Sequence, residues 1–409
     1  MEEWKEYKVA EVIEEISMGP FGSNIKRDNY VDSGVPYLNG SNLSSYKLNE
    51  ESFNYVTDEK AKSLGRCVAK RGDVIVTHRG TIGQISYIPY DSKYENYLTG
   101  NSQFRLTVNN KVIRPDFFVY YFHTRMGQHR LLANASQVGV PALARPTSTF
   151  KEVLVSVPKM EVQNKIMDIL HSLDDKIEVN RRINNNLEQQ AQALFKSWFV
   201  DFEPFKDQLF VESEFGMIPQ GWRVGNLSEI ADVIMGTSPS GLSYNTEGKG
   251  DVFYQGRAEF GFRFPERNLY TTEAKRFADV NTVLVSVRAP VGDINVAEER
   301  CCIGRGLASI KSNKGCNSYI LYLMQSLKPV FDRFNGEGTV FGSINKKSFE
   351  DLKVVIPDEK SILEFDSISS LIDSQIKRTV QESRRLAELR DTLLPRLMSG
   401  ELSVNDIKG

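Results

Sequence analysis

The sequence is poor in the features that mark metal-binding, disulfide-rich and membrane proteins. Its four cysteines have neither the spacing of a zinc site nor that of a disulfide framework, which is typical of free thiols in a reducing compartment. The four histidines are scattered and form no HExxH-type pair. No apolar run approaches the roughly 18–20 residues that span a bilayer, and the start is acidic rather than signal-like. We expect a cytoplasmic protein with no metal site and no membrane contact.

Motifs for catalysis are also missing. The chain has no GxxxxGK[ST] loop, no glycine-rich dinucleotide fingerprint and no Asn-Pro-Pro-aromatic motif. These absences argue against nucleotide hydrolysis and against methylation of a base amine by the chain itself. No Ser/His/Asp or Cys/His group can be assembled from the sequence. We therefore predict a protein that is not an enzyme, with no catalytic residue and no cofactor.

Charge of one sign is lacking overall but varies along the chain. The net charge is −2 and the pI is 6.2, so no global signature of a nucleic-acid binder is present. Residues 1–158 and 219–357 each carry a net charge of +2, whereas residues 159–218 carry −4 and residues 358–409 carry −2. A slightly basic block followed by an acidic block thus occurs twice.

The sequence itself repeats in the same way. Four pairs of segments match in order: "WKEYKVAEVIEEI" with "WRVGNLSEIADVI", "PYLNG" with "VFYQG", "VIVTHRGTIGQI" with "VLVSVRAPVGDI", and "FKEVLVSVP" with "FEDLKVVIP". The period of about 200 residues indicates a tandem domain duplication rather than a solenoid. In each half, short β-branched runs alternate with turn signals, which predicts an α+β fold with a strongly bent sheet. Residues 116–132 and 317–334 each read as one amphipathic helix.

Each globular half is followed by a heptad pattern. The first seam runs through Ile166, Leu170, Leu173, Ile177, Asn180, Asn184, Leu187, Ala191, Leu194 and Trp198. Adding 199 to each number gives a second seam: Phe365, Ser369, Ile372, Ile376, Thr379, Ser383, Leu386, Arg390, Leu393 and Leu397. Because strict heptads serve helix pairing, we predict an intramolecular antiparallel coiled coil. The expected segments are two tandem domains, 1–158 and 222–357, two long helices, 159–205 and 358–409, and a linker, 206–221.

The end of the first helix is unusually aromatic. In "LFKSWFVDFEPF", residues 194–205, four aromatic side chains share one helix face: Phe195, Trp198, Phe199 and Phe202. Leu393, Leu394 and Leu397 hold the equivalent place in the second copy. We predict that these residues form a docking face for a partner or for the neighbouring globular domain. The alternative is that they are buried within the chain's own hinge, and the two roles are open to different rings.

Together with this stretch, "FGMIPQGW" (residues 215–222) and "LLPRLMSGEL" (residues 393–402) resemble the signatures of type I restriction–modification specificity subunits. The resemblance covers essentially the whole chain. It implies two target recognition domains that each read one half of a split, asymmetric site in double-stranded DNA. It also implies conserved helices that set the spacing and bind two methyltransferase subunits, with restriction and translocase subunits joining through the complex.

Base readout requires polar side chains on loops that reach a DNA groove. The candidates in the first half are Ser23, Asn24, Lys26, Asn39, Arg79, Thr81, Asn101, Gln103 and Arg145. In the second half they are Gln255, Arg257, Arg263, Arg288, Arg305, Asn345, Lys346 and Lys347. Arg79 and Arg288 follow matched strands. The alternative to base reading is therefore that these two arginines stabilise the fold or bind a phosphate. Two rival functions stay open: an enzyme that acts on DNA unaided, and a pseudo-symmetric protein-binding scaffold without DNA readout.

Overall fold

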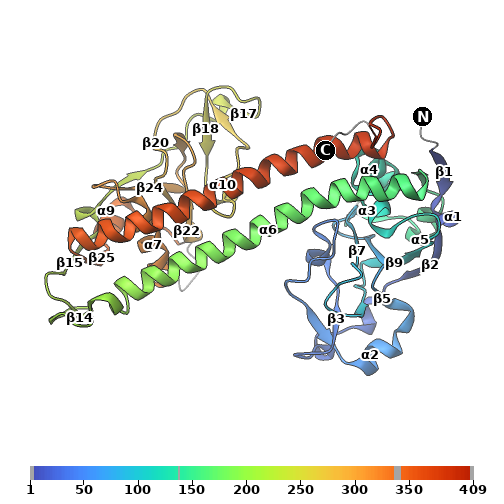
Figure 1. Cartoon of the computed structure of the whole chain (residues 1–409), viewed down its shortest axis with the longest axis horizontal. Helices are drawn as coiled ribbons and strands as arrows, with labels where there is room; N and C mark the ends of the chain where they lie inside the picture. The colour runs from blue at the N-terminus through green and yellow to red at the C-terminus, as the bar shows by residue number, and fades with distance from the viewer. Residues whose placement is uncertain (1–3, 137–138, 336–341, 406–409) are drawn as a thin grey trace. The chain divides into compact units, whose positions relative to one another are not determined.

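A computed structural model describes residues 4–136, 139–335 and 342–405 of the chain (Figure 1). The chain divides into two compact units. The first unit combines residues Met1–Ile177 with Arg384–Gly409, and the second comprises Glu178–Ser383. Each unit therefore contains one globular domain and one segment of each of two long helices. This division cuts across the predicted segments, because each helix contributes residues to both units.

Two four-stranded sheets form the globular part of the first unit. One has the order β2-β9-β6-β7, with bounds Ile13–Met18, Gln103–Val108, Val74–Thr77 and Ile85–Tyr87. The other has the order β4-β3-β8-β5, with bounds Asn54–Val56, Val35–Tyr37, Asn96–Leu98 and Val68–Lys70. The predicted mixed α/β content is confirmed. The prediction of one strongly bent sheet is wrong, because strands of three to six residues end before one ladder can continue around the bend.

Short elements complete the first unit. Two antiparallel strand pairs are β1–β12 and β10–β11, with bounds Lys5–Lys8, Leu154–Val157, Ala135–Ser136 and Ala142–Leu143. The helices of the domain are α1 to α5, with bounds Val9–Val12, Asp58–Ser63, Pro115–His123, Arg125–Leu132 and Pro146–Lys151. Helix α3 is almost entirely buried in the core that includes the β2-β9-β6-β7 sheet. Its aromatic residues lie there with Phe104 and Phe150.

The second unit repeats this topology, which confirms the duplication. Its first sheet has the order β16-β24-β21-β22, with bounds Ala231–Met235, Leu307–Ser312, Val283–Val287 and Val291–Val296. Its second sheet has the order β17-β19-β18-β23-β20, with bounds Tyr244–Asn245, Tyr270–Thr271, Asp251–Tyr254, Cys301–Ile303 and Phe277–Ala278. In both second sheets one parallel pair, β3–β8 or β18–β23, is flanked by antiparallel neighbours. Strand β17 is an addition at the edge.

Besides short 3-10 turns, the described part of the second unit contains two further strand pairs and three short α-helices. The pairs are β15–β25 and β13–β14, with bounds Arg223–Asn226, Lys353–Ile356, Phe210–Ser213 and Gly216–Pro219. The helices are α7, α8 and α9, with bounds Asn317–Ser326, Lys328–Arg333 and Lys346–Glu350.

The prediction of one helix over residues 116–132 and one over 317–334 is wrong, since each segment forms two helices. Thr124 breaks the first segment, because its hydroxyl accepts a hydrogen bond from the backbone N–H of Gly127 and caps α4. In the second segment Pro329 lies in the first turn of α8, a position that proline tolerates at a helix start but not in a helix interior.

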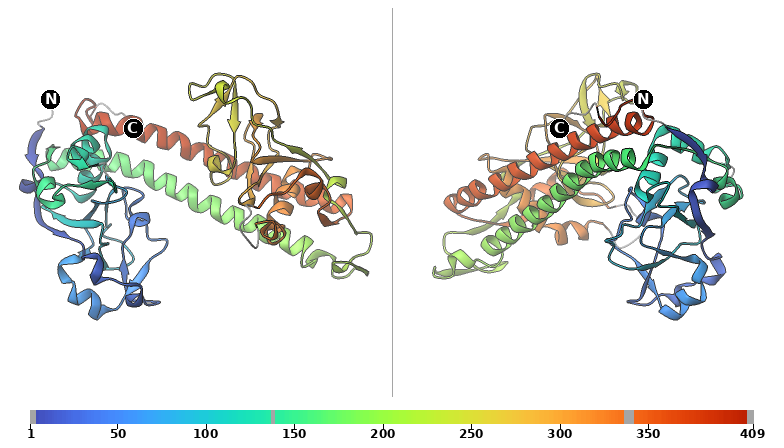
Figure 2. Two further views of the ribbon diagram at one scale, coloured as in Figure 1. Left: turned by 180° about the vertical axis from the view of Figure 1, so that it is seen from behind. Right: turned by 45° about the vertical axis from the view of Figure 1, so that its right-hand side comes forward.

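The two long helices, α6 (Met160–Phe199) and α10 (Glu359–Met398), pair antiparallel within each unit (Figures 1 and 2). In the first unit Asp174 of α6 contacts Arg390 of α10, and Lys165 contacts Asn405, which follows the end of α10. In the second unit Asn180, Asn184 and Phe195 contact Glu382, Thr379 and Phe365 in turn. As the residue numbers along α6 rise, the numbers of their partners on α10 fall, so the two helices run antiparallel. The predicted antiparallel coiled coil is confirmed.

The seam of this coiled coil follows the predicted heptads. All twenty seam positions are buried or half-buried, and none is exposed. The polar step at its middle is bonded across the two helices: the Asn180 amide donates to the Glu382 carboxylate at 2.8 Å, and the Thr379 hydroxyl donates to the Asn184 side-chain oxygen. None of the helices among the described residues is long and apolar enough to cross a membrane.

The aromatic end of α6 lies in the core of the second unit. Phe195 and Phe199 are buried and pack against Tyr319 of α7 and Phe365 of α10, while Trp222 lies 5.8 Å from Phe199 between ring centroids. Trp198 and Phe202 are partly buried against the same core. Phe195 and Phe199 therefore dock on the neighbouring domain and are buried in the chain's own core, so they do not form a face for a separate partner. Trp198 and Phe202 are only half-buried, and a partner-docking role for these two rings stays a prediction. Helix spacing alone does not distinguish the two roles.

The equivalent leucines of α10 are likewise internal. Leu394 and Leu397 are buried in the core of the first unit, and Leu393 packs partly against it. They lie with Val9, Phe117 and Ile166 in one cluster. Because the end of α10 covers the domain that precedes α6, these leucines stabilise the fold and are not available to a partner.

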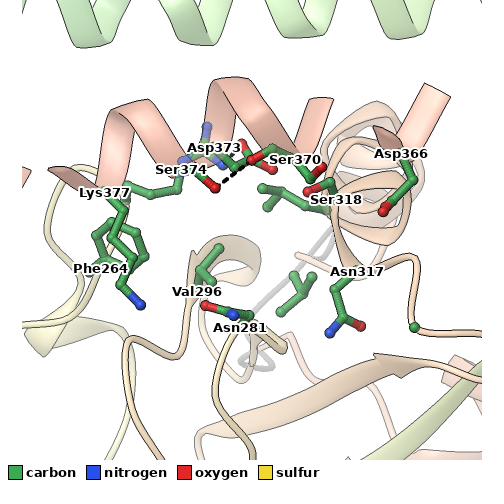
Figure 3. Close-up of a pocket in the computed structure, with 14 residues that line it drawn as sticks. Phe264, Asn281, Val296, Asn317, Ser318, Asp366, Ser370, Asp373, Ser374 and Lys377 are labelled. Carbon is green, nitrogen blue, oxygen red and sulfur yellow. Dashed lines mark hydrogen bonds and ion pairs between the residues drawn. The ribbon is translucent and has the colours of Figure 1, made fainter. Parts of the chain in front are cut away.

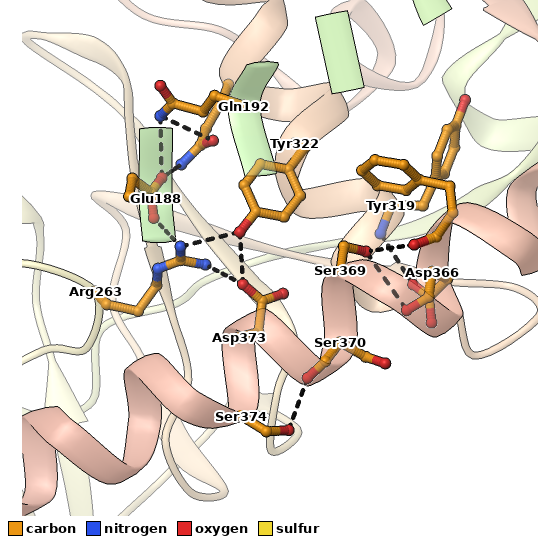
Figure 4. A network of polar contacts seen from close by, with 12 residues as sticks. Glu188, Gln192, Arg263, Tyr319, Tyr322, Asp366, Ser369, Ser370, Asp373 and Ser374 are labelled. Carbon is orange, nitrogen blue, oxygen red and sulfur yellow. Dashed lines mark hydrogen bonds and ion pairs between the residues drawn. The ribbon is translucent and has the colours of Figure 1, made fainter. Parts of the chain in front are cut away.

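A charged cluster fixes the second domain on the two helices (Figure 4). Arg263 donates to Asp373 of α10 at 2.9 Å and to Glu188 of α6, and the Tyr322 hydroxyl donates to Asp373 at 2.6 Å. Gln325 donates to Glu188 at 2.7 Å. We call Arg263, Glu188, Tyr322 and Asp373 the second clamp. Arg263 is only 4% exposed, so its predicted role in reading DNA is wrong: the guanidinium is needed to neutralise two carboxylates.

The first unit has a related cluster, which we call the first clamp. Tyr120 of α3 donates its hydroxyl to Asp174 of α6, and Arg390 of α10 donates to the same carboxylate at 2.7 Å. The ring of Tyr46 stacks on Tyr120, with 4.0 Å between centroids, and burial raises the pKa of Tyr46 to about 12. Asp174 and Asp373 occupy the same place in the repeat, but their arginines come from different elements.

The aromatic core predicts a large stability loss on truncation. Phe199→Ala removes a ring that packs against five others, so the free energy of unfolding of the second unit is expected to fall by about 3–5 kcal/mol. Hydrogen exchange, monitored as denaturant is added, measures the free energy of unfolding of the second unit separately. The exposed neighbour Val200→Ala is the control and is expected to have little effect. Equal, small losses in both variants would contradict the assignment of Phe199 to the core.

The second clamp predicts a similar loss by a different cause. Arg263→Ala leaves Glu188 and Asp373 without their cation, and a broken buried pair costs about 3–5 kcal/mol. The control is Arg267→Ala, whose half-exposed side chain pairs with Glu299 at 2.6 Å and is expected to contribute less than about 1 kcal/mol. The same measurement applies. If Arg263→Ala is no more destabilising than Arg267→Ala, the clamp does not hold the domain.

Candidate DNA-reading loops

Five loops of the first unit meet at one place, and we call them the first loop cluster: residues 19–26, 38–42, 78–83, 99–102 and 139–145. Backbone hydrogen bonds tie them together. Gly19 N donates to Gln103 O at 2.9 Å, His78 N to Ser102 O at 2.9 Å, and Leu143 N to His78 O at 2.8 Å. Because each loop is held by another, the cluster is an ordered surface rather than a set of independent loops.

The second loop cluster comprises residues 236–243, 255–259, 288–290, 304–306 and 342–345 of the second unit. The same bonds recur at equivalent positions: Gly236 N donates to Leu307 O at 2.9 Å, Val287 N to Gly306 O at 2.9 Å, and Ile344 N to Val287 O at 3.1 Å. The repeat has therefore preserved the framework of the cluster while the side chains that it carries differ.

Glycine is required where two of these loops cross. A Cβ atom on Gly19 would lie 2.1 Å from the carbonyl oxygen of Gly100, and one on Gly236 would lie 2.2 Å from that of Gly304. No real Cβ contact is that short, so any larger residue would push the loops apart. The first turn after β2 and after β16 is thus fixed against the loop that precedes β9 and β24.

Most predicted reading residues lie on these two clusters or directly beside them. In the first, Lys26, Arg79, Thr81, Asn101 and Arg145 are exposed, and Asn24 and Asn39 are half-buried. In the second, the exposed residues are Gln255, Arg257, Arg288, Arg305, Asn345, Lys346 and Lys347. The backbone of Ser23 belongs to a 3-10 turn, whereas its side chain lies outside the described residues.

Arg79 and Arg288 hold matched positions. Each follows a central strand, β6 or β21, and forms a backbone bridge to the segment before a short helix. Arg79 bridges to Ala142, before α5, and Arg288 bridges to Ser343, before α9. The backbone of both residues thus serves the fold, as the alternative prediction held, while both side chains are exposed. Within the described part of the chain, neither guanidinium has an acidic partner. Asn101 and Arg305 form a second matched pair.

Several candidates are already engaged in structure. Gln103 is 1% exposed and its side-chain oxygen accepts from Gly100 N at 2.8 Å, so it holds the loop and cannot reach a groove. The prediction that Gln103 reads DNA is therefore wrong. Asn39 and Asn345 cap short helices by accepting backbone N–H groups at 2.9 Å. Arg257 pairs with Asp293 at 2.7 Å, and Lys346 pairs with Glu350 at 3.3 Å.

Two apolar side chains at the clusters escaped the search for polar readers. Phe21 and Leu242 lie on the equivalent loops after β2 and β16, and they are 82% and 99% exposed. A search for single apolar residues between proline and glycine in a turn would have selected Phe21, in "GPFG". Leu242 follows glycine in "SPSGLS" and carries a weaker signal.

The second unit also contains a cavity of about 400 Å³ beside α10 (Figure 3). Its charged lining residues are already paired. Asp366 accepts from Tyr319 N at 3.0 Å, Asp373 belongs to the second clamp, and Lys377 donates to the Glu298 carbonyl at 3.3 Å. These contacts give the cavity a structural role at the junction of domain and helix.

Neither metal nor thiol chemistry is suggested by the side chains. Among the residues that the structure describes, no group of three or more His, Cys, Asp or Glu is placed to hold a metal ion. The four cysteines are free, and burial raises the pKa of the Cys301 thiol to about 12. A thiol with such a pKa is protonated at neutral pH and is a poor nucleophile.

Comparison with known proteins places this architecture. The family model of the type I restriction modification DNA specificity domain matches residues 1–189 and 219–382. A type I restriction enzyme specificity subunit of Methanocaldococcus jannaschii is 31% identical over 98% of this chain and 94% of its own length. The HindI specificity subunit of Haemophilus influenzae is 25% identical over 98% of this chain and all of its own.

A solved structure supports the same fold. The crystal structure of the S subunit of a type I restriction–modification system from M. genitalium aligns with a TM-score of 0.58 at 16% identity. The alignment covers 97% of this chain and 96% of that one. With the family model matching both halves and a full-length relative above 30% identity, this chain belongs to the family of type I restriction–modification specificity subunits.

Proposed function

We propose that this chain is the sequence-specific DNA-binding subunit of a type I restriction–modification complex, in which each loop cluster reads one half of a bipartite, asymmetric target. The observation that carries the proposal is the matched pair of loop clusters. Both are ordered by the same backbone bonds and both expose arginines without acidic partners in the described chain. Arginine is the side chain that most often contacts guanine edges in the major groove. These arginines disfavour a scaffold that binds protein alone.

The difference between the clusters supports an asymmetric target. Equivalent positions carry different readers: Asn101 corresponds to Arg305, each following the glycine that the crossing loop meets, Gly100 or Gly304. Asparagine suits adenine and arginine suits guanine, so two such clusters select different half-sites. The low net charge fits a complex in which other subunits neutralise many phosphates.

The partners are double-stranded DNA, two methyltransferase subunits and, through the complex, restriction and translocase subunits. Catalysis belongs to those subunits, in keeping with the missing cofactor and nuclease motifs, and the complex acts in the cytoplasm. Since two of the four aromatic residues at the end of α6 are buried, methyltransferase docking falls to Trp198, Phe202 and other residues. Apolar side chains that stay exposed on the helices are the further candidates: Val179, Ile183, Leu363, Ile368, Leu371 and Leu389.

The helices set the spacing between half-sites in this proposal. Each of α6 and α10 contains 40 residues, which corresponds to about 60 Å of helix. Heptad pairing and the buried polar step keep one register between them, so the helix length is fixed by the sequence. A spacer set in this way responds to insertions in the helices and not to changes in the loops.

Arg79 and Arg288 test the division of labour between the clusters. Arg79→Ala is expected to relax or abolish recognition of one half-site, and Arg288→Ala that of the other, with a loss of about 1–3 kcal/mol each if the side chain contacts a base. Methylome sequencing of cells that express the chain with its methyltransferase partner measures the target directly.

The exposed arginines Arg66 and Arg276 lie outside the loop clusters and provide matched controls. Their alanine variants are expected to methylate the wild-type target. A uniform weakening of all sites by Arg79→Ala, without altered sequence preference, would assign it to a phosphate. If both Arg79→Ala and Arg288→Ala leave target and extent of methylation unchanged, the clusters do not read the DNA.

Matched insertions test the helices as a spacer. One heptad added after Asn180 and one after Gln381 lengthen both helices by about 10 Å and keep the seam in phase. This corresponds to about three base pairs, which also rotate the second half-site by about 100°. The accepted spacer is expected to lengthen by one to three base pairs, with weaker methylation and unchanged half-sites.

The control carries the same seven residues between Asp207 and Gln208, beyond the end of α6. That insertion leaves both helices at their original length, so the spacer is expected to stay as in the wild type. Methylome sequencing distinguishes the variants. Full methylation with an unchanged spacer in the double helix insertion would mean that the helices do not set the spacing.

A further inference from the structure

Phe21 and Leu242 lie on equivalent loops of the two repeats, although at different positions within those loops. Phe21 caps the 3-10 turn η1 (Gly22–Asn24), and Leu242 lies within the 3-10 turn η7 (Gly241–Ser243). Both turns follow the first strand of the four-stranded sheet, and both belong to a loop cluster. Isolated exposed apolar residues are common on protein surfaces. Here, however, among the residues that the structure describes, the most exposed large apolar side chain of each domain lies on the equivalent loop.

These side chains are held out by ordered loops. Asn24 N donates to Phe21 O at 2.8 Å, and Ser243 N donates to Ser240 O at 3.0 Å. The Ser243 hydroxyl also bonds to that of Thr271 at 2.7 Å, which fixes η7 on its sheet. The glycine crossings at Gly19 and Gly236 anchor the start of each loop. The fold therefore holds the Phe21 and Leu242 side chains in solvent, because the bonded loops keep both residues away from the core of their own unit.

The surroundings of both residues are cationic and polar. Lys26 and Asn101 lie on the first cluster with Phe21, and a Cβ on Gly22 would lie 3.4 Å from the Asn101 amide nitrogen. Arg305 lies beside the loop of Leu242, since its backbone N–H donates to the Ser238 hydroxyl at 3.2 Å. An apolar tip among such side chains suits a partner that is anionic outside and apolar inside. Duplex DNA, with phosphates around stacked bases, has that chemistry.

We propose that Phe21 and Leu242 are wedges, each of which inserts between two neighbouring base pairs of the half-site that its own loop cluster reads. This rests on the proposed function. Apolar wedges of this kind partly unstack a base step and bend the duplex. Insertion covers both sides of a side chain, in accord with tips that are free almost all round. A thymine methyl contact, the competing mode, would cover one side only.

The wedge gives specificity without hydrogen bonds. Pyrimidine–purine steps unstack most easily, so a wedge favours a half-site that contains such a step at its position. Phenylalanine stacks on bases through its ring, whereas leucine only separates them. The two half-sites are therefore deformed differently, which adds to the asymmetry of the polar readers.

The test uses the full chain with its methyltransferase partner and the duplex target identified by methylome sequencing. 2-Aminopurine replaces one purine at a time in each half-site, because its fluorescence rises when it unstacks. Wild-type complex is expected to raise the fluorescence at one step in each half-site. Phe21→Ala is expected to lose the rise in the first half-site only, Leu242→Ala in the second only, and each to weaken binding about ten-fold.

Control variants are available in both units. Tyr90→Ala and Leu209→Ala remove side chains that are 63% and 72% exposed outside the loop clusters, and both are expected to bind like the wild type. Phe21→Leu and Leu242→Phe keep a wedge and are expected to retain the fluorescence rise. Thermal unfolding of each variant should match the wild type, since none of these side chains is in a core.

The outcomes separate this proposal from the function on which it rests. A wild-type complex that does not select the target over random duplex contradicts the proposed function, and the wedge with it. Selective binding with unchanged affinity and fluorescence in Phe21→Ala and Leu242→Ala overturns the wedge alone. The absence of any fluorescence rise with the wild-type complex also overturns the wedge. If Phe21→Ala or Leu242→Ala then weakens binding as much as replacing thymine by uracil does, the side chain contacts a thymine methyl group instead.

Discussion

Asn180 and Asn184 lie in the seam between α6 and α10, where one amide donates to Glu382 and the other accepts from Thr379. A polar pair in an apolar seam leaves its groups unsatisfied in any other register, so it selects one alignment of the helices. Both compact units depend on that alignment, because each takes one segment from each helix. The cores, the clamps and the loop clusters assemble on helix faces that this register brings together.

With the register fixed, the long helices act as the missing layer of each domain. The aromatic end of α6 completes the core of the second unit through Phe195 and Phe199, and the end of α10 completes that of the first unit through Leu394 and Leu397. The clamps then place each domain by a half-buried carboxylate that accepts from tyrosine and arginine together. The loop clusters are carried by short strands that are packed on these cores. Recognition thus takes place on loops, while their support comes from the helices.

The sequence predicted those features that repeat or have a period. The tandem duplication, the heptad seam with its polar step, and the matched arginines Arg79 and Arg288 follow from spacing alone. Burial was not predictable in the same way. Arg263 looked like a loop arginine because its partners, Glu188 and Asp373, are 75 and 110 residues away in the chain. Gln103 looked like a reader because a side chain that holds its own loop has the same local sequence as one that reaches outwards. The aromatic face of α6 had the spacing of a docking surface and of a core helix alike, and only the position of Tyr319 and Phe365 separates them.

The two clamps take their arginines from different elements, and this affects whether either half of the chain could pair with a second copy of itself. Position 390 in the second helix corresponds to Ala191 in the first, and Glu188 corresponds to Ala387. Two copies of the first half, paired in the same antiparallel manner, would set alanine where Arg390 neutralises Asp174. Two copies of the second half would bring Arg390 beside Arg263 with one carboxylate fewer to share. Each half thus relies on a charged residue that the other supplies, so the two unlike halves complete each other's clamps and two copies of either half would not.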